Sequence, residues 1–150
     1  MEKVRLGIIG IGNMGTTHSK SLTEGLVPEM ELTAVADRKE SRRVWCKENL
    51  PESVTIFEEG KDLIASGKCD AVLIAVPHYQ HPELAIDAFD HDLHVLCEKP
   101  AGVYTKQVRL MNERAQASDK VFAMMFNQRT NCVYRKMHEL VTSGELGAIK

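Results

Sequence analysis

Val4-Arg5-Leu6-Gly7-Ile8-Ile9 is a mostly apolar run that leads directly into the glycine motif Gly10-Ile11-Gly12-Asn13-Met14-Gly15. A run of this kind, followed by glycines at this spacing and then by an amphipathic segment, is typical of a strand, a phosphate-binding turn and a helix. Gly10 is expected to permit the tight turn, Gly12 to let the backbone approach a pyrophosphate, and Gly15 to let helix and strand pack closely. Because the amide groups at a helix N-terminus attract negative charge, the motif predicts a dinucleotide site rather than a merely structural turn.

Short apolar runs alternate with amphipathic stretches along the rest of the chain, as in a parallel sheet covered by helices. The expected strands are Val4–Gly10, Glu31–Asp37, Val54–Phe57, Ala71–Val76, His94–Cys97 and Val121–Phe126. The expected helices are Met14–Glu24, Lys39–Glu48, Gly60–Ala65, Pro82–Phe89, Thr105–Ala117 and Thr130–Thr142. Right-handed crossovers between such strands favour the order 3-2-1-4-5-6. The sequence therefore predicts an α/β protein with a three-layer, doubly wound parallel sheet, the Rossmann NAD(P)-binding fold.

Two residues at the end of the second expected strand bear on which dinucleotide is bound. Asp37 stands where a carboxylate can accept hydrogen bonds from the ribose hydroxyls of the adenosine, which favours NAD. Arg38 follows it, with Arg42 and Arg43 one helical turn further on, and guanidinium groups there can hold the 2′-phosphate of NADP. These arginines also fit a solvated helix face. Because Asp37 would repel the extra phosphate, NAD is the expected cofactor and NADP a second possibility.

The end of the fourth expected strand reads Ala75-Val76-Pro77-His78-Tyr79-Gln80-His81, and the strand gives way there to the next helix. A metal site at His78 and His81 is not expected, since no cysteine, aspartate or further histidine stands nearby at ligand spacing. Helix capping and surface packing account for these histidines as well as contact with cofactor or substrate does. We include Ala75, Val76, Pro77, His78 and His81 among the expected cofactor-binding residues.

The fifth expected strand ends in Glu98-Lys99-Pro100. A lysine at a strand end beside a ligand crevice is a candidate for proton transfer or substrate orientation, because loss of water favours the uncharged amine. From spacing alone, an ordinary surface ion pair is the favoured interpretation of Lys99.

Size and charge limit the class of protein. The chain has 150 residues, enough for one domain but not for two. Its formal charge of -2 provides no basic surplus for nucleic acid. No apolar run approaches the ~20 residues that span a bilayer, and no signal peptide precedes the first strand, so a cytoplasmic protein is expected. The four cysteines form no CxxC pair and are expected to be reduced.

These pieces together resemble the Gfo/Idh/MocA family, which is named after glucose-fructose oxidoreductase and inositol dehydrogenase. The matching stretches are Leu6–Gly15, Ala36-Asp37, Val76–His81, Cys97–Pro100, Phe126–Arg129 and Gly144–Gly147. The most specific of them is Glu98-Lys99-Pro100 at this distance from the glycine motif. The resemblance covers essentially the whole chain.

The resemblance implies an NAD(P)-dependent oxidoreductase acting on a CH–OH group of a sugar, polyol or related small molecule. It implies that Lys99 is catalytic, that Glu98 and the Lys99–Pro100 bond shape the nicotinamide pocket, and that this bond is often cis. It also places Asn127 and Arg129 close to cofactor and substrate. Relatives are usually homo-oligomers, and they carry further catalytic residues in a C-terminal substrate and oligomerisation domain.

That second domain is absent from residues 1–150, where a strand only begins at Ala148-Ile149-Lys150, so we expect a truncated chain that binds dinucleotide but is inactive alone. A non-catalytic module that senses NAD(H) is the first alternative. The second is another type of Rossmann enzyme, such as a semialdehyde dehydrogenase or a nucleotide-linked isomerase. That enzyme would need a nucleophilic cysteine or a Tyr/Lys pair on one helix, and neither is evident.

Overall fold

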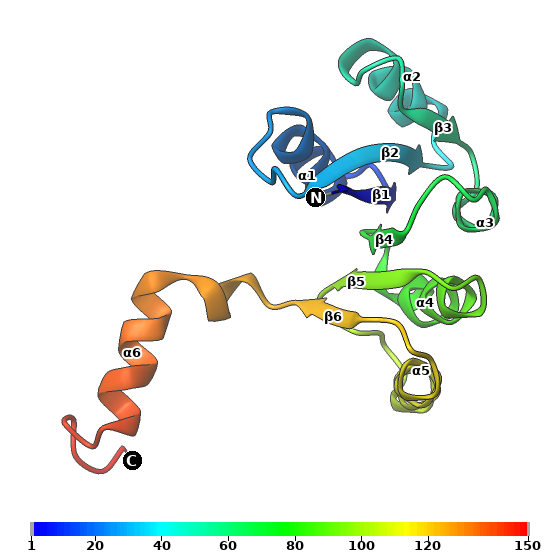
Figure 1. The fold of residues 1–150 in the computed structure, drawn as a ribbon. Helices are drawn as coiled ribbons and strands as arrows, with labels where there is room; N and C mark the ends of the chain where they lie inside the picture. The colour runs from blue at the N-terminus through cyan, green and yellow to red at the C-terminus, as the bar shows by residue number, and fades with distance from the viewer. Residues whose placement is uncertain (1, 150) are drawn as a thin grey trace.

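The strands form one parallel sheet in the order β3-β2-β1-β4-β5-β6, which confirms the predicted doubly wound topology (Figure 1). This computed structural model describes residues 2–149. The strands are β1 (Val4–Ile9), β2 (Met30–Ala36), β3 (Thr55–Phe57), β4 (Ala71–Ile74), β5 (His94–Glu98) and β6 (Phe122–Met125). The α-helices are α1 (Asn13–Thr23), α2 (Glu40–Asn49), α3 (Gly60–Ala65), α4 (His81–Asp90), α5 (Thr105–Ala117) and α6 (Cys132–Thr142). Two 3-10 helices, η1 (His78–Gln80) and η2 (Asn127–Thr130), follow β4 and β6.

Every expected element is present, with bounds that differ by at most two residues. The strand expected to begin at Ala148 is the exception, because Ala148 and Ile149 have no strand structure and Lys150 lies outside the described residues. A strand needs a neighbouring strand to receive its hydrogen bonds. The preceding helix, α6, points away from the sheet and carries the following residues with it (Figure 1).

Two hydrophobic clusters fill the two faces of the sheet. In the first, Leu63 of α3, Leu84 of α4 and Met111 of α5 pack against the strands, and these three helices lie on one side in Figure 1. In the second, strand residues such as Ile8 pack against Cys46 of α2 and, at its edge, the helix α1. The strands are short and apolar because both of their faces are covered. Among the described residues, no helix combines the length and apolarity that crossing a bilayer requires.

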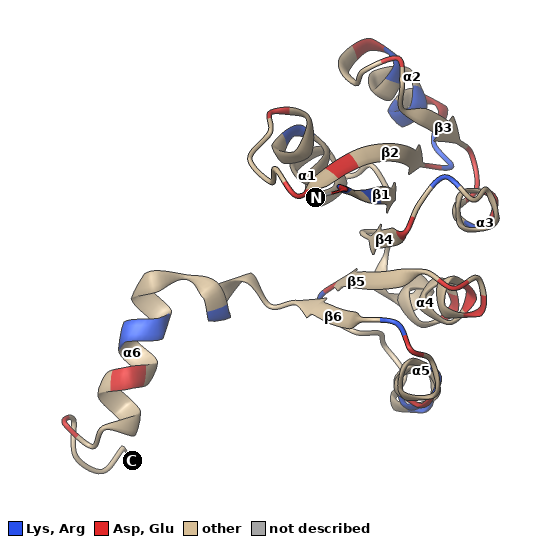
Figure 2. Cartoon of the chain, in the orientation of Figure 1, with Lys and Arg blue, Asp and Glu red and all other residues tan. Residues whose placement is uncertain are grey.

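Charged residues of both signs are distributed over helices, loops and parts of the strands β1 and β2 (Figure 2). The cysteines differ in exposure: Cys46, Cys69 and Cys97 are buried, while Cys132 at the start of α6 is exposed. Three of the four therefore behave as small apolar core residues.

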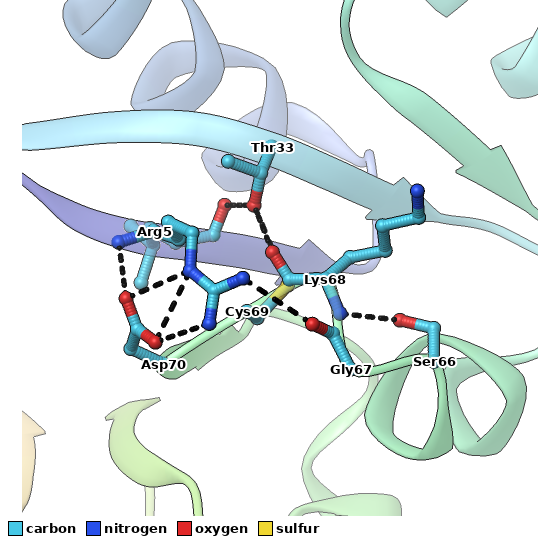
Figure 3. Close-up of polar contacts among 8 residues, drawn as sticks. Arg5, Thr33, Ser66, Gly67, Lys68, Cys69 and Asp70 are labelled. Carbon is cyan, nitrogen blue, oxygen red and sulfur yellow. Dashed lines mark hydrogen bonds and ion pairs between the residues drawn. The ribbon is translucent and has the colours of Figure 1, made fainter.

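Arg5 and Asp70 join the amino-terminal ends of β1 and β4, two strands that are neighbours in the sheet but 65 residues apart in the chain (Figure 3). The Arg5 guanidinium donates to both carboxylate oxygens of Asp70, and the Arg5 amide donates to Oδ2 at 3.0 Å. A further guanidinium bond reaches the carbonyl of Gly67 at 3.3 Å. The pair fixes the register of β1 against β4 at the edge opposite the glycine motif.

We expect the Arg5–Asp70 pair to make the stability of the folded chain fall at low pH. Hydrogen bonds from Arg5 lower the pKa of Asp70 below its ordinary value. Because the native pKa lies below the unfolded one, ionised Asp70 stabilises the native state above the unfolded pKa, and this contribution is lost as the pH falls through the native pKa. Asp70→Asn should therefore lower the melting temperature at pH 7 by about 2–3 °C, a small effect because both side chains are partly exposed. The difference from the parent chain should shrink in thermal scans below about pH 4, and an unchanged difference there would contradict the assignment.

Candidate functional site

The glycine motif forms a sharp turn between β1 and α1, as the sequence predicts. Gly10 has a φ of 94°, in the left-handed region that favours glycine. A Cβ on Gly15 would lie 1.9 Å from the carbonyl oxygen of Gly10. The helix therefore passes so close to the turn that only glycine fits at position 15.

Gly12 is the N-cap residue of α1, and its environment is the opposite of that at Gly15. A Cβ on Gly12 would meet nothing within 4 Å, so the backbone here faces open space. Within the described residues, no side chain caps this helix. The amide groups of the first turn are therefore available to an anion, and a ligand can approach the backbone directly.

The open space beside the motif is a cavity of about 450 Å³, within the usual range for small-molecule sites. It lies at the carboxyl ends of β1, β2 and β4, where the strand order reverses. In open α/β sheets, ligands bind at this switch point. Seven of the expected cofactor-binding residues line it: Gly10, Gly12, Asp37, Arg38, Ala75, Val76 and Pro77.

Asp37 links the glycine turn to the end of β2. Its Oδ2 accepts a hydrogen bond of 2.7 Å from the Ile11 amide, and its Oδ1 accepts one of 2.8 Å from the Lys39 amide. The Ile11 side chain is fully buried in the second cluster, so Ile11 meets the site through its backbone alone. Each carboxylate oxygen keeps a second lone pair that can receive a hydroxyl group.

Two of the three arginines near Asp37, Arg38 and Arg43, already have partners in the protein. Arg38 Nε donates to Glu59 at 2.8 Å. Arg43 donates to the backbone carbonyls of Asp37 and Arg38, at 2.9 and 2.7 Å, and lies 3.4 Å from Glu58. Arg42 lines the cavity together with the two glutamates.

His81 was expected among the cofactor-binding residues, but its ring is buried inside the protein. It is 1% exposed, and its ring nitrogens lie 2.8 Å from the carbonyl oxygens of Val76 and Pro100. Backbone groups occupy both polar atoms of the ring, so His81 supports the site rather than contacting a cofactor through them. His78, three residues earlier, is exposed at the start of η1.

Glu98 is a buried carboxylate with a partner that the sequence analysis missed. It is 6% exposed at the end of β5, and its Oε1 lies 2.9 Å from Nε2 of His18 on α1. Its Oε2 accepts a weaker bond of 3.3 Å from the Lys99 amide. The signal for His18 was its position three residues after Gly15, on a helix that must pass close to the sheet.

Lys99 and Pro100 follow Glu98 and are exposed at the same edge of the sheet. The bond between them is cis, as the family resemblance implies. The preceding residue, Cys97, is fully buried, and burial followed by the charge of Glu98 raises the pKa of its thiol to about 12. Cys97 is therefore a protonated core residue and not a nucleophile.

The remaining expected site residues lie around this edge. Asn13 and Met14 are exposed in the first turn of α1. Asn127 and Arg129 are exposed in η2 after β6, where the Arg129 guanidinium lies 5.1 Å from the centre of the Phe126 ring. The structure thus brings the glycine turn, Asp37 and residues 75–77 together around one cavity, with Lys99 directly after the neighbouring strand β5.

The fold and this cavity define a dinucleotide-binding Rossmann domain. Residues 4–126 match the Gfo/Idh/MocA family, described as an oxidoreductase family with an NAD-binding Rossmann fold. The chain belongs to this family, and NAD is the cofactor for which the domain is built.

Relatives of known identity agree with this assignment. The chain is 31% identical to myo-inositol 2-dehydrogenase from Thermotoga maritima, over 96% of this chain and 42% of the relative. Among solved structures, myo-inositol 2-dehydrogenase from Lactobacillus plantarum superposes with a TM-score of 0.91 at 29% identity, over 99% of this chain and 43% of the other. Scyllo-inositol dehydrogenase from Lactobacillus casei, solved with NAD(H) and scyllo-inositol, gives 0.90 at 27% identity, over 99% and 43%. The chain thus spans less than half the length of these relatives.

Proposed function

We propose that this chain is the cofactor-binding part of an NAD-dependent oxidoreductase that acts on a CH–OH group of a polyol or sugar. The observation that supports this most strongly is the cavity at the switch point, bounded by the bare backbone of Gly12 on one side and by Asp37 on the other. A pyrophosphate fits against the uncapped first turn of α1, and ribose hydroxyls fit against the carboxylate. When bound, the nicotinamide supplies the hydride-transfer chemistry.

The surroundings of Asp37 favour NAD over NADP. A 2′-phosphate in this cavity would meet the carboxylates of Asp37, Glu58 and Glu59. It would also compete with Glu59 for the Arg38 guanidinium. Arg42 remains the group best placed to receive a phosphate, so weaker binding of NADP is part of the proposal.

We assign the other site residues by their places around the cavity. The amides of Gly12, Asn13, Met14 and Gly15 face the phosphates, while Ala75, Val76 and Pro77 form the wall towards the nicotinamide. Lys99 is the catalytic residue of this chain, because it lies at the exposed edge next to that wall, where its ammonium group can donate to a reacting hydroxyl and its neutral amine can accept a proton from one. His78, Asn127 and Arg129 complete the rim on the substrate side.

The proposal extends to the whole protein. Since the inositol dehydrogenases that resemble it are more than twice as long, residues 1–150 form the dinucleotide-binding domain of a longer, cytoplasmic, homo-oligomeric enzyme. The rest of that enzyme would supply the substrate pocket and further proton-transfer groups, so the isolated domain binds cofactor without turnover.

A titration of the purified chain with NADH and NADPH tests the proposal. The readouts are nicotinamide fluorescence and energy transfer from Trp45, the only tryptophan. We expect saturable binding of NADH and at least about tenfold weaker binding of NADPH, the factor that corresponds to ~1.4 kcal/mol. Absence of binding of either at millimolar concentration would refute the assignment.

Lys99→Ala separates the enzyme from a non-catalytic NAD(H) sensor. In this chain the variant should bind NADH as the parent does, within about twofold, because Lys99 does not line the nucleotide cavity. In the longer protein it should reduce turnover by about 10²–10⁴-fold, the usual contribution of a general acid–base group. Unchanged turnover would favour the sensor.

A further inference from the structure

His81 connects two backbone turns that the sheet itself leaves unconnected. The last paired residues of β4 and β5 are Ile74 and Cys97. The Val76 and Pro100 carbonyl oxygens, two and three residues further on, each lie 2.8 Å from a ring nitrogen of His81. The ring is 1% exposed, so water does not compete for these contacts.

The chemistry of the two turns explains why a side chain is needed here. Two carbonyl oxygens are both acceptors and do not bond to each other, and Pro100 has no N–H to donate. A donor between them is the only way to link them. The imidazole ring fills the space between the two turns, and its N–H is a donor that a carbonyl oxygen can accept from.

The two turns held by His81 are the ones that face the nicotinamide end of the proposed site. Val76 lines the cavity, and Lys99 directly precedes Pro100. A shift of one turn against the other would change where the Lys99 ammonium lies relative to the wall formed by residues 75–77. Misplacement of about 1 Å is enough to impair a reaction that depends on alignment.

We propose that His81 is a positioning residue whose buried ring, seated between the Val76 and Pro100 carbonyls, holds Lys99 and the nicotinamide wall in register. This inference rests on the proposed function, since it assigns the nicotinamide end of the cofactor to this part of the cavity. It gives His81 a role through Lys99 and Val76, without contact with the cofactor.

The first test compares NADH with ADP-ribose, which lacks the nicotinamide. His81→Phe keeps a ring of similar size but removes both ring nitrogens, and His81→Gln restores a side-chain N–H donor. We expect His81→Phe to weaken NADH binding about tenfold while ADP-ribose binding changes by less than about twofold, with partial recovery in His81→Gln. His91→Gln, at the exposed far end of the same helix, is the matched control and should bind both ligands as the parent does.

The outcomes separate the alternatives. Equal weakening of NADH and ADP-ribose would mean that His81 only stabilises the fold, and unchanged NADH binding would mean that the turns need no link; either result overturns the inference. If the parent chain binds ADP-ribose but not NADH, the inference fails while the nucleotide site stands. If it binds neither, the proposed function fails and the inference fails with it.

A second measurement reads the His81 contacts in the parent chain directly. Nitrogen-15 NMR, with the signal assigned by its loss in His81→Gln, should find a His81 ring N–H that is protected from exchange with water. A ring N–H in rapid exchange with water would contradict the buried contacts between His81 and the two turns.

Discussion

Gly15→Ala is expected to abolish NADH binding and to destabilise the chain by about 3 kcal/mol, the upper range for forcing an extra methyl group into a packed interior. The new Cβ would lie 1.9 Å from the Gly10 carbonyl oxygen, far inside van der Waals contact. The neighbour is backbone and not the end of a flexible side chain. The helix α1 must therefore move away from the turn, and the first-turn amides move with it.

Gly12→Ala is the matched control, because the same chemical change falls where the protein has room. Gly12 has a φ of -78°, which alanine adopts without strain, and its Cβ would meet nothing within 4 Å. We expect its free energy of unfolding to stay within about 1 kcal/mol of the parent's. NADH should nevertheless bind about 100-fold more weakly, because the methyl group occupies the surface that the pyrophosphate approaches.

Urea denaturation and NADH titration of both variants give the required comparison. A Gly15→Ala chain as stable as the parent would show that α1 can move without cost. A Gly12→Ala chain that binds NADH normally would show that the pyrophosphate lies elsewhere, and the assignment of the cavity would then be wrong.

The sheet order and nearly all element bounds were predictable because they follow from local patterns. Buried strands such as β4 are continuous apolar runs, and the glycine motif marks one strand–helix junction by its own chemistry. Right-handed crossovers leave few ways to arrange six such units. The strand expected at Ala148 is not formed in the described residues. An apolar pattern predicts a strand correctly only where the fold places another strand beside it, and none lies beside Ala148 and Ile149 in that part of the chain.

Side-chain partners were predictable only in part, because they join residues far apart in the sequence. Glu98 could be placed at the rim of the sheet from its position at a strand end, and the family resemblance implied its role in the site, but its pairing with His18 spans 80 residues. Arg38 was correctly placed beside Asp37, while its bond to Glu59 depends on how the loop after β3 returns to the sheet. The burial of His81 follows from the approach of the Lys99–Pro100 turn, which no periodicity in α4 indicates.

His18→Ala is expected to destabilise the chain by about 3 kcal/mol, the cost of leaving a buried charge without its partner. The Glu98 side chain is only 7% exposed, and Nε2 of His18 at 2.9 Å is its one side-chain partner among the described residues. The remaining bond, from the Lys99 amide at 3.3 Å, is long. Glu98→Gln should cost less, about 1 kcal/mol, because a neutral amide needs less compensation than a carboxylate.

The double variant His18→Ala/Glu98→Gln distinguishes a buried charge pair from simple loss of packing. If the carboxylate is what His18 compensates, the double variant is more stable than His18→Ala alone, and the urea-unfolding cycle gives a coupling energy of about 1–2 kcal/mol. His138→Ala, on the exposed helix α6, should change stability by less than about 0.5 kcal/mol and controls for the loss of an imidazole. Additive effects would mean that His18 and Glu98 act independently. A coupled pair would instead tie α1, which follows the glycine turn, to the end of β5, which Lys99 directly follows, so that the two ends of the proposed site depend on one contact.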